Sequence, residues 1–244
     1  MKKICSIFIL SFILVALMTS PGSGQTAEEI IKKMIEVQGG KKVFESIKDM
    51  TLSGTLEVVQ QGLSGSITVC KKEPDKMRRD IEIMGMVVTQ AYDGKTAWWI
   101  NIHQNGNTEE MEEQQAAEMK RQSLPIISLL YPEKYGFSFD NKGKEKIEDK
   151  DYFVIEETYP DGFKATLYVD TETYLIYKAK AKTMSPMGFE VESEQFTSDY
   201  KKVDGMIVAH SMVTFVEGEE YMKIAITSVK FNTGLEDSFF KMNQ

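Results

Sequence analysis

The sequence contains very little histidine and cysteine, the side chains that most readily serve as bases, nucleophiles and metal ligands. The only examples are His103, His210, Cys5 and Cys70. Neither histidine has a second ligand at the short spacing that is typical of zinc sites. The motifs of phosphate-binding loops, serine hydrolases and β-lactamases are also incomplete. We therefore expect no catalytic residues, no metal and no cofactor.

Long hydrophobic runs are also scarce, because the chain has a single one, from Ile4 to Met18. Lys2 and Lys3 precede this run, and small residues follow it up to Gly24. This layout is typical of a secretory signal peptide, and the run is shorter than the roughly 20 apolar residues of a spanning helix. We expect a signal peptide over 1–24 and a single mature domain over 25–244.

Removal of the signal peptide would leave Cys70 as the only thiol, so no intramolecular disulfide could form. It would also remove two of the 29 basic residues and none of the 37 acidic ones, which gives a net charge of −10. Such a charge repels nucleic acids and anionic membrane surfaces. We expect a protein that is not integral to a membrane and does not bind nucleic acid. It should be periplasmic, or secreted if the cell has no outer membrane.

The mature chain begins with a helical pattern and continues as strands. Thr26 and Glu29 have the spacing of a capping box, and apolar residues follow at helical spacing over 27–38. From Met50 to Val58 the apolar residues alternate with polar ones, as on a half-buried strand. Turn signals after residue 50 indicate about ten to twelve strands. The pattern predicts an antiparallel meander, which must curl because flat sheets of that size are unusual.

One segment interrupts the strand pattern. Residues 107–110, Asn-Thr-Glu-Glu, are suited to begin a helix that runs to about Arg121. An apolar stretch, 124–131, follows and ends at Pro132. The first part is too polar for a core, whereas the second is too apolar for water. We interpret the segment as a helical insertion whose apolar end packs into the curled sheet.

The two tryptophans lie on a predicted hairpin. Asp93-Gly94 favours a two-residue type I′ turn, with Tyr92 opposite Lys95. Neighbouring residues of a strand point to opposite faces, so Trp98 and Trp99 cannot both serve one core. The pairing places Val87, Trp98 and Ile100 on one face and Trp99 on the other, and both faces are substantially apolar. Register alone leaves open which tryptophan faces inward.

Residues 93–101, DGKTAWWIN, resemble a hairpin of the LolA-like superfamily of periplasmic lipoprotein-localisation proteins. Residues 167–175, LYVDTETYL, are similar to a strand-turn-strand segment of the lipoprotein-sorting members. Residues 199–205 and 235–240 resemble their closing segment. The chain departs from the carriers at Ile102, where they tend to have proline.

The resemblance implies a mainly β fold: a curved antiparallel, unclosed β-barrel with an N-terminal helix and a helical lid. It also implies an apolar cavity that holds a lipid, an acyl chain or a lipoprotein, in which Trp98 is the matched position. Trp99 would face the opposite surface, where an envelope protein could dock. The alternative function is a cell-envelope sensor or interaction module with no free cavity. The residues that we expect to line the cavity are Trp98, Val87, Ile100, Leu124, Ile127 and Leu130.

Overall fold

The computed structural model describes residues 24–101, 106–184 and 189–242. The predicted signal peptide therefore lies outside the described residues, apart from Gly24, and so do Ile102 and His103. No helix in the described part of the chain combines the length and the apolar character needed to cross a membrane.

The fold is one antiparallel sheet of 13 strands, in the order β6-β5-β4-β3-β2-β1-β13-β12-β11-β10-β9-β8-β7. The strands are β1 (Asp49–Val58), β2 (Leu63–Lys72), β3 (Lys76–Ile83), β4 (Met86–Tyr92), β5 (Ala97–Asn101), β6 (Asn107–Glu110), β7 (Ser138–Ile147), β8 (Lys150–Thr158), β9 (Lys164–Asp170), β10 (Ile176–Met184), β11 (Glu190–Val203), β12 (Met206–Val216) and β13 (Glu219–Phe231). The helices are α1 (Ala27–Val37), α2 (Gly40–Ser46), α3 (Glu113–Ser123) and α4 (Pro132–Tyr135), with 3-10 turns η1 (Val59–Gln61), η2 (Ile126–Leu130) and η3 (Asp237–Phe240).

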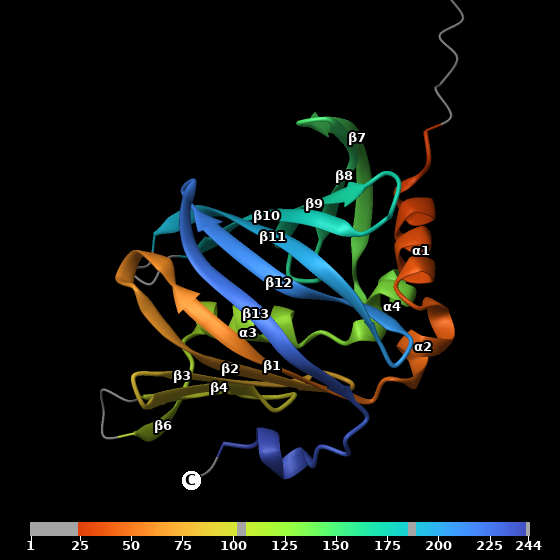
Figure 1. Cartoon of the computed structure of the whole chain (residues 1–244). Helices are drawn as coiled ribbons and strands as arrows, with labels where there is room; N and C mark the ends of the chain where they lie inside the picture. Colours follow the sequence, from red (N-terminus) through yellow and green to blue (C-terminus); the bar gives the residue numbers. More distant parts are fainter. Residues whose placement is uncertain (1–23, 102–105, 185–188, 243–244) are drawn as a thin grey trace, which may run out of the picture.

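The sheet is strongly curved and does not close into a barrel (Figure 1). The first and last strands, β1 and β13, pair in its middle, so the two ends of the domain are joined by backbone hydrogen bonds. Helix α3 lies in the hollow, α1 and α2 lie at one end of it, and η3 lies on the outer side (Figure 1). We call the side that faces α1 and α3 the concave face and the opposite side the convex face. The prediction of a curved, unclosed sheet is confirmed.

Helix α1 begins as the sequence predicts. Thr26 Oγ1 accepts a hydrogen bond from the Glu29 backbone N–H at 3.2 Å, and Glu29 Oε2 accepts one from the Thr26 N–H at 3.0 Å. This capping box satisfies two N–H groups that the first turn would otherwise leave unpaired. The buried stripe of the helix then packs on the concave side chains of β8 and β9, a core formed by Ile30, Ile31, Met34, Phe153, Ile155, Leu167 and Val169.

The start of the predicted insertion is wrong. Residues Asn107–Glu110 form strand β6, with Thr108 opposite Ile100, and α3 begins only at Glu113. The physical reason is the open edge of β5, whose backbone N–H and C=O groups gain hydrogen bonds when the next segment pairs with it. The second half of the interpretation is confirmed, because Ile126 and Leu129 of η2 pack into the α1 core.

The predicted two-residue hairpin turn is also wrong. Tyr92 pairs with Ala97 instead of Lys95, so the turn holds four residues, 93–96. The Asp93 carboxylate accepts hydrogen bonds from the backbone N–H groups of Lys95 at 2.9 Å and Thr96 at 2.8 Å, and this stabilises the longer turn. A two-residue shift keeps each side chain on its face, so the predicted division of the hairpin into two faces still holds.

Candidate ligand-binding site on the concave face

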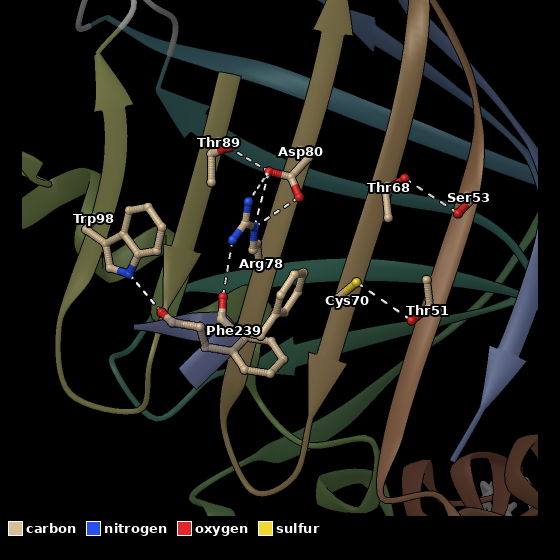
Figure 2. Close-up of polar contacts among 10 residues, drawn as sticks. Thr51, Ser53, Thr68, Cys70, Arg78, Asp80, Thr89, Trp98 and Phe239 are labelled. Atoms are coloured by element: carbon tan, nitrogen blue, oxygen red, sulfur yellow. Dashed lines mark hydrogen bonds and ion pairs between the residues drawn. The ribbon is translucent and has the colours of Figure 1, made fainter. Parts of the chain in front are cut away.

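The two tryptophans point to opposite faces, and Trp98 is the one on the convex face. Its side chain is 2% exposed, and its Nε1 donates a hydrogen bond to the carbonyl oxygen of Phe240 in η3 at 2.8 Å (Figure 2). Phe240 itself is fully buried. Trp98 therefore fills the space between the outer side of the sheet and the C-terminal segment.

A polar network beside Trp98 holds η3 in place. The Arg78 guanidinium donates to the Phe239 carbonyl oxygen at 3.3 Å and lies 4.5 Å from the centroid of the Phe239 ring. The same guanidinium forms an ion pair with Asp80, which also accepts a hydrogen bond from Thr89 at 2.6 Å (Figure 2). Arg78, Asp80 and Thr89 therefore all have partners within the protein. The arrangement is suited to structural attachment of the C-terminal segment.

The structure does not bring the six predicted lining residues together. Val87 and Ile100 share the convex face with Trp98, and Val87 is 46% exposed there. Leu124, Ile127 and Leu130 lie in and before η2, on the side of the sheet where α1 packs. Leu130 contacts the α1 core, whereas Leu124 and Ile127 are half-buried. The sheet therefore separates the three predicted lining residues of the hairpin from the three of the 124–130 segment.

Trp99 lies on the concave face, in the place that the sequence assigned to Trp98. It is half-buried, and the register places it in one cross-strand row with Gln90, Arg79, Val69 and Leu52. The outward-facing Trp99 surface that could receive a partner protein is thus absent, because Trp99 faces the hollow. The indole remains accessible to a molecule that enters there.

The concave face carries a continuous apolar surface across β1, β2, β3, β11, β12 and β13. Its buried members are Leu56, Ile67, Ile224, Ile226 and Val229. The half-buried side chains that pack around them are Leu52, Val58, Val69, Ile81, Ile83, Val203, Val208, Met212, Met222 and Phe231. A filled core would bury these residues completely, so the hollow retains accessible apolar area over this part of the sheet.

Helix α3 covers only one side of the hollow. It packs on β3, β4 and β5, where Met119 joins a small core with Met77, Tyr92 and Ala97. Between α3 and the strands β9 and β10 runs a groove of about 640 Å³, with Ala117 and Gln122 on its helical wall and Phe163 and Met184 on the opposite wall. The volume falls within the range of ligand sites, roughly 300–1,000 Å³.

Two cations, Lys71 and Arg79, also point into the hollow. Lys71 Nζ donates to the Leu124 carbonyl oxygen at 3.5 Å, and burial lowers the pKa of Lys71 to about 8, against a smaller opposite effect of Glu73. Arg79 donates to the side-chain oxygens of Gln90 and Gln122, and burial lowers its pKa as well. The sequence alone indicates that both cations point inward. Lys71 is two residues from Val69, and Arg79 is two residues from Met77, so each shares the inward face of its strand with an apolar residue.

The remaining reactive side chains have structural surroundings. Cys70 is 4% exposed beside the Thr51 hydroxyl, and burial raises the pKa of its thiol. His210 is 8% exposed, with Nδ1 2.9 Å from the Val208 carbonyl oxygen. The described residues contain no cluster of three or more histidine, cysteine, aspartate or glutamate side chains that could hold a metal ion. The surroundings of Cys70 and His210 are suited to packing.

The sequence matches no protein-family model and no curated protein at a significant level. Solved structures do resemble it. A LolA superfamily protein from Nitrosomonas europaea superposes with a TM-score of 0.62 at 16% identity, over 89% of this chain and 98% of its own. A DUF1329 family protein from Desulfovibrio piger gives 0.59 at 14% identity, over 89% and 98%. An outer membrane lipoprotein-sorting protein domain from Vibrio parahaemolyticus gives 0.57 at 15% identity, over 88% and 95%.

Identities this low establish a shared fold and leave the activity open. The superpositions cover at least 88% of this chain and at least 95% of each of these structures. The chain therefore has the LolA-like fold that its hairpin motif suggested.

Proposed function

We propose that the protein is an exported periplasmic binding protein that holds the acyl chain of a lipid or lipoprotein against its concave face. One observation carries this proposal: the half-buried apolar surface of β1–β3 and β11–β13, which α3 leaves partly uncovered. A role as a carrier in outer-membrane lipoprotein sorting is the form of this function that the shared fold supports.

The energetics favour an alkyl ligand. Burial of apolar surface yields about 0.8 kcal/mol for each methylene, so a chain of about twelve methylenes gains about 10 kcal/mol. Association costs about 4–15 kcal/mol in lost freedom, so most of a long acyl chain must be buried for stable binding. The concave surface extends over six neighbouring strands, so an acyl chain can lie across it.

Methionines at the site would allow it to bind acyl chains of more than one length. Met212 and Met222 are half-buried on the concave face, and Met184 lines the groove. The methionine side chain is unbranched and polarizable, so it repacks around differently shaped apolar partners at small cost.

A charge placed on the concave face should abolish binding, whereas the same charge on the convex face should not. Met212→Glu puts a carboxylate where an acyl chain would lie, and the matched control Val87→Glu puts one on the exposed convex side. We expect native mass spectrometry of protein purified from the cell envelope to show bound lipid in the unmodified chain and in Val87→Glu, and at least about tenfold less in Met212→Glu.

Far-ultraviolet circular dichroism should confirm that both variants are folded, and Met222→Glu provides a second concave variant if Met212→Glu is not. Lipid-free protein bound to an envelope protein would contradict the proposal and favour a sensor or interaction module. Equal lipid content in the concave and convex variants would contradict the location of the site.

A further inference from the structure

Lys71 and Arg79 differ from the other half-buried cations of this protein in their partners. Arg78 forms an ion pair with Asp80 at 3.0 Å, and Lys178 forms one with Glu194 at 2.9 Å. Both of these pairs lie on the convex face. Among the described residues, no ion pair within 4.0 Å includes Lys71 or Arg79.

The partners of the two concave cations are neutral oxygens. Arg79 Nε lies 3.1 Å from Gln90 Oε1, which also accepts a hydrogen bond from Arg79 Nη2, and Arg79 Nη1 lies 3.4 Å from Gln122 Oε1. Within the described part of the chain, the one hydrogen-bond partner of Lys71 Nζ is the Leu124 carbonyl oxygen, at the long distance of 3.5 Å. Removing a cation from water is costly unless a counter-charge or strong hydrogen bonds compensate. All of these acceptors are neutral, and a negative group would compensate the two positive charges better.

The nearby carboxylates do not supply that negative group. The Glu73 side chain accepts a hydrogen bond from the Ile126 backbone N–H at 3.1 Å, which directs it to the start of η2. Glu118 is exposed on α3 and accepts a hydrogen bond from Gln122 at 2.9 Å. Both acids influence the cations through space but contact neither of them within ion-pair distance.

The sheet places the two cations close together. Val69 is opposite Arg79, and Lys71 is opposite Met77, so Lys71 and Arg79 are diagonal neighbours on β2 and β3. The backbones of such diagonal neighbours lie about 7–8 Å apart across the two strands, so their long side chains can reach one another. A group with two or three oxygens can therefore contact both. The apolar surface begins in the cross-strand row of Arg79, with Leu52 and Val69.

We propose that Lys71 and Arg79 bind the anionic head, a carboxylate or a phosphate, of an acyl ligand whose chain lies on the apolar concave surface. This inference rests on the proposed function and specifies its ligand class. The oxygens of the head replace the neutral contacts to Gln122 and Leu124 at the end of α3. The guanidinium donates two N–H groups in one plane to such oxygens, and the ammonium supplies a second positive charge.

The test compares three ligands that carry the same chain and different heads: oleate, oleoyl lysophosphatidate and oleyl alcohol. Each is measured below its critical micelle concentration by displacement of the neutral fluorescent probe N-phenylnaphthylamine. We expect oleate or the phosphate to displace the probe at about tenfold lower concentration than the alcohol, because a charge-assisted contact in a desolvated site favours the anion. The better of the two anionic ligands identifies the head.

Variants test whether Lys71 and Arg79 cause the preference for an anionic head. Lys71→Met with Arg79→Met should bring the three ligands to within about twofold of one another, whereas Arg79→Lys should retain a preference for the anion. The matched control is Lys180→Met, which removes a convex lysine paired with Glu192 and should keep the full preference. The double variant should fold, because it replaces two charges that have no ionic partner among the described residues with apolar side chains.

Equal displacement by all three ligands in the unmodified protein would overturn this inference and leave the proposed function intact. An anion preference that survives in the double variant would also overturn it. Displacement by none of the three ligands would contradict the proposed function itself, and this inference with it.

Discussion

At the scale of single residues, the function depends on which side of the sheet a side chain occupies. Trp98 and Trp99 are adjacent in sequence, yet one contacts η3 and the other faces the hollow. Alternation along the strand predicts that they point apart, but it does not indicate which direction is inward. The direction is set by Phe240, 142 residues further along the chain, which covers Trp98. No pattern near the tryptophans contains that information.

Glu157 permits a residue-scale prediction about pH. The side chain is 5% exposed among the apolar residues of the concave face, and burial raises its pKa to about 7, with a smaller lowering effect of the Tyr159 hydroxyl. A carboxyl group with a raised pKa binds its proton more tightly in the folded state. Its stabilising contribution is therefore complete below the unfolded pKa of about 4.3 and is lost as the pH rises through about 7.

Glu157→Gln removes this titration while it keeps the size of the side chain. Relative to the variant, the unmodified protein should lose about 2 to 3 kcal/mol of unfolding free energy between pH 4.5 and pH 8, at about 1.4 kcal/mol for each pKa unit. Urea denaturation of both proteins across this range measures the difference. A constant difference at all pH values would show that Glu157 ionises normally.

At the scale of elements, local signals predicted the parts that are stabilised locally. The capping box of Thr26 and Glu29 fixes the start of α1. Strand β6 could not be found in this way, because Asn107–Glu110 is polar and has a sequence suited to a helix start. Its strand conformation comes from hydrogen bonds to β5, which are tertiary contacts.

The attachment of η3 over Trp98 gives an element-scale prediction. Phe240 is fully buried, so Phe240→Ala should destabilise the protein by about 3–5 kcal/mol and should expose Trp98. The matched control, Met84→Ala, truncates a side chain that is 75% exposed and should change stability by less than about 0.5 kcal/mol. Urea denaturation gives both values, and a red shift of tryptophan emission reports the exposed indole. Similar stabilities of the two variants would show that η3 is only loosely attached.

At the scale of the whole molecule, the sequence predicts the architecture better than the site. Alternating strands and frequent turns are sufficient for a curled antiparallel sheet, because curvature follows from the twist of many paired strands. The pairing of β1 with β13 completes that sheet from opposite ends of the domain. The site depends on which face the helices and η3 leave uncovered. Their packing is decided by the complete fold, so Lys71 and Arg79 were missed as candidates although their inward phase is visible in the sequence.

The central claim is that an acyl chain lies on the concave face, and the two tryptophans allow a direct measurement. Trp98→Phe leaves Trp99 in the hollow as the only indole, and Trp99→Phe leaves Trp98 beneath η3. Bromine quenches an indole only at close range, so titration with dibrominated stearate should quench the emission of Trp98→Phe and leave that of Trp99→Phe nearly unchanged. Quenching of Trp98 alone, or of neither tryptophan, would contradict the account.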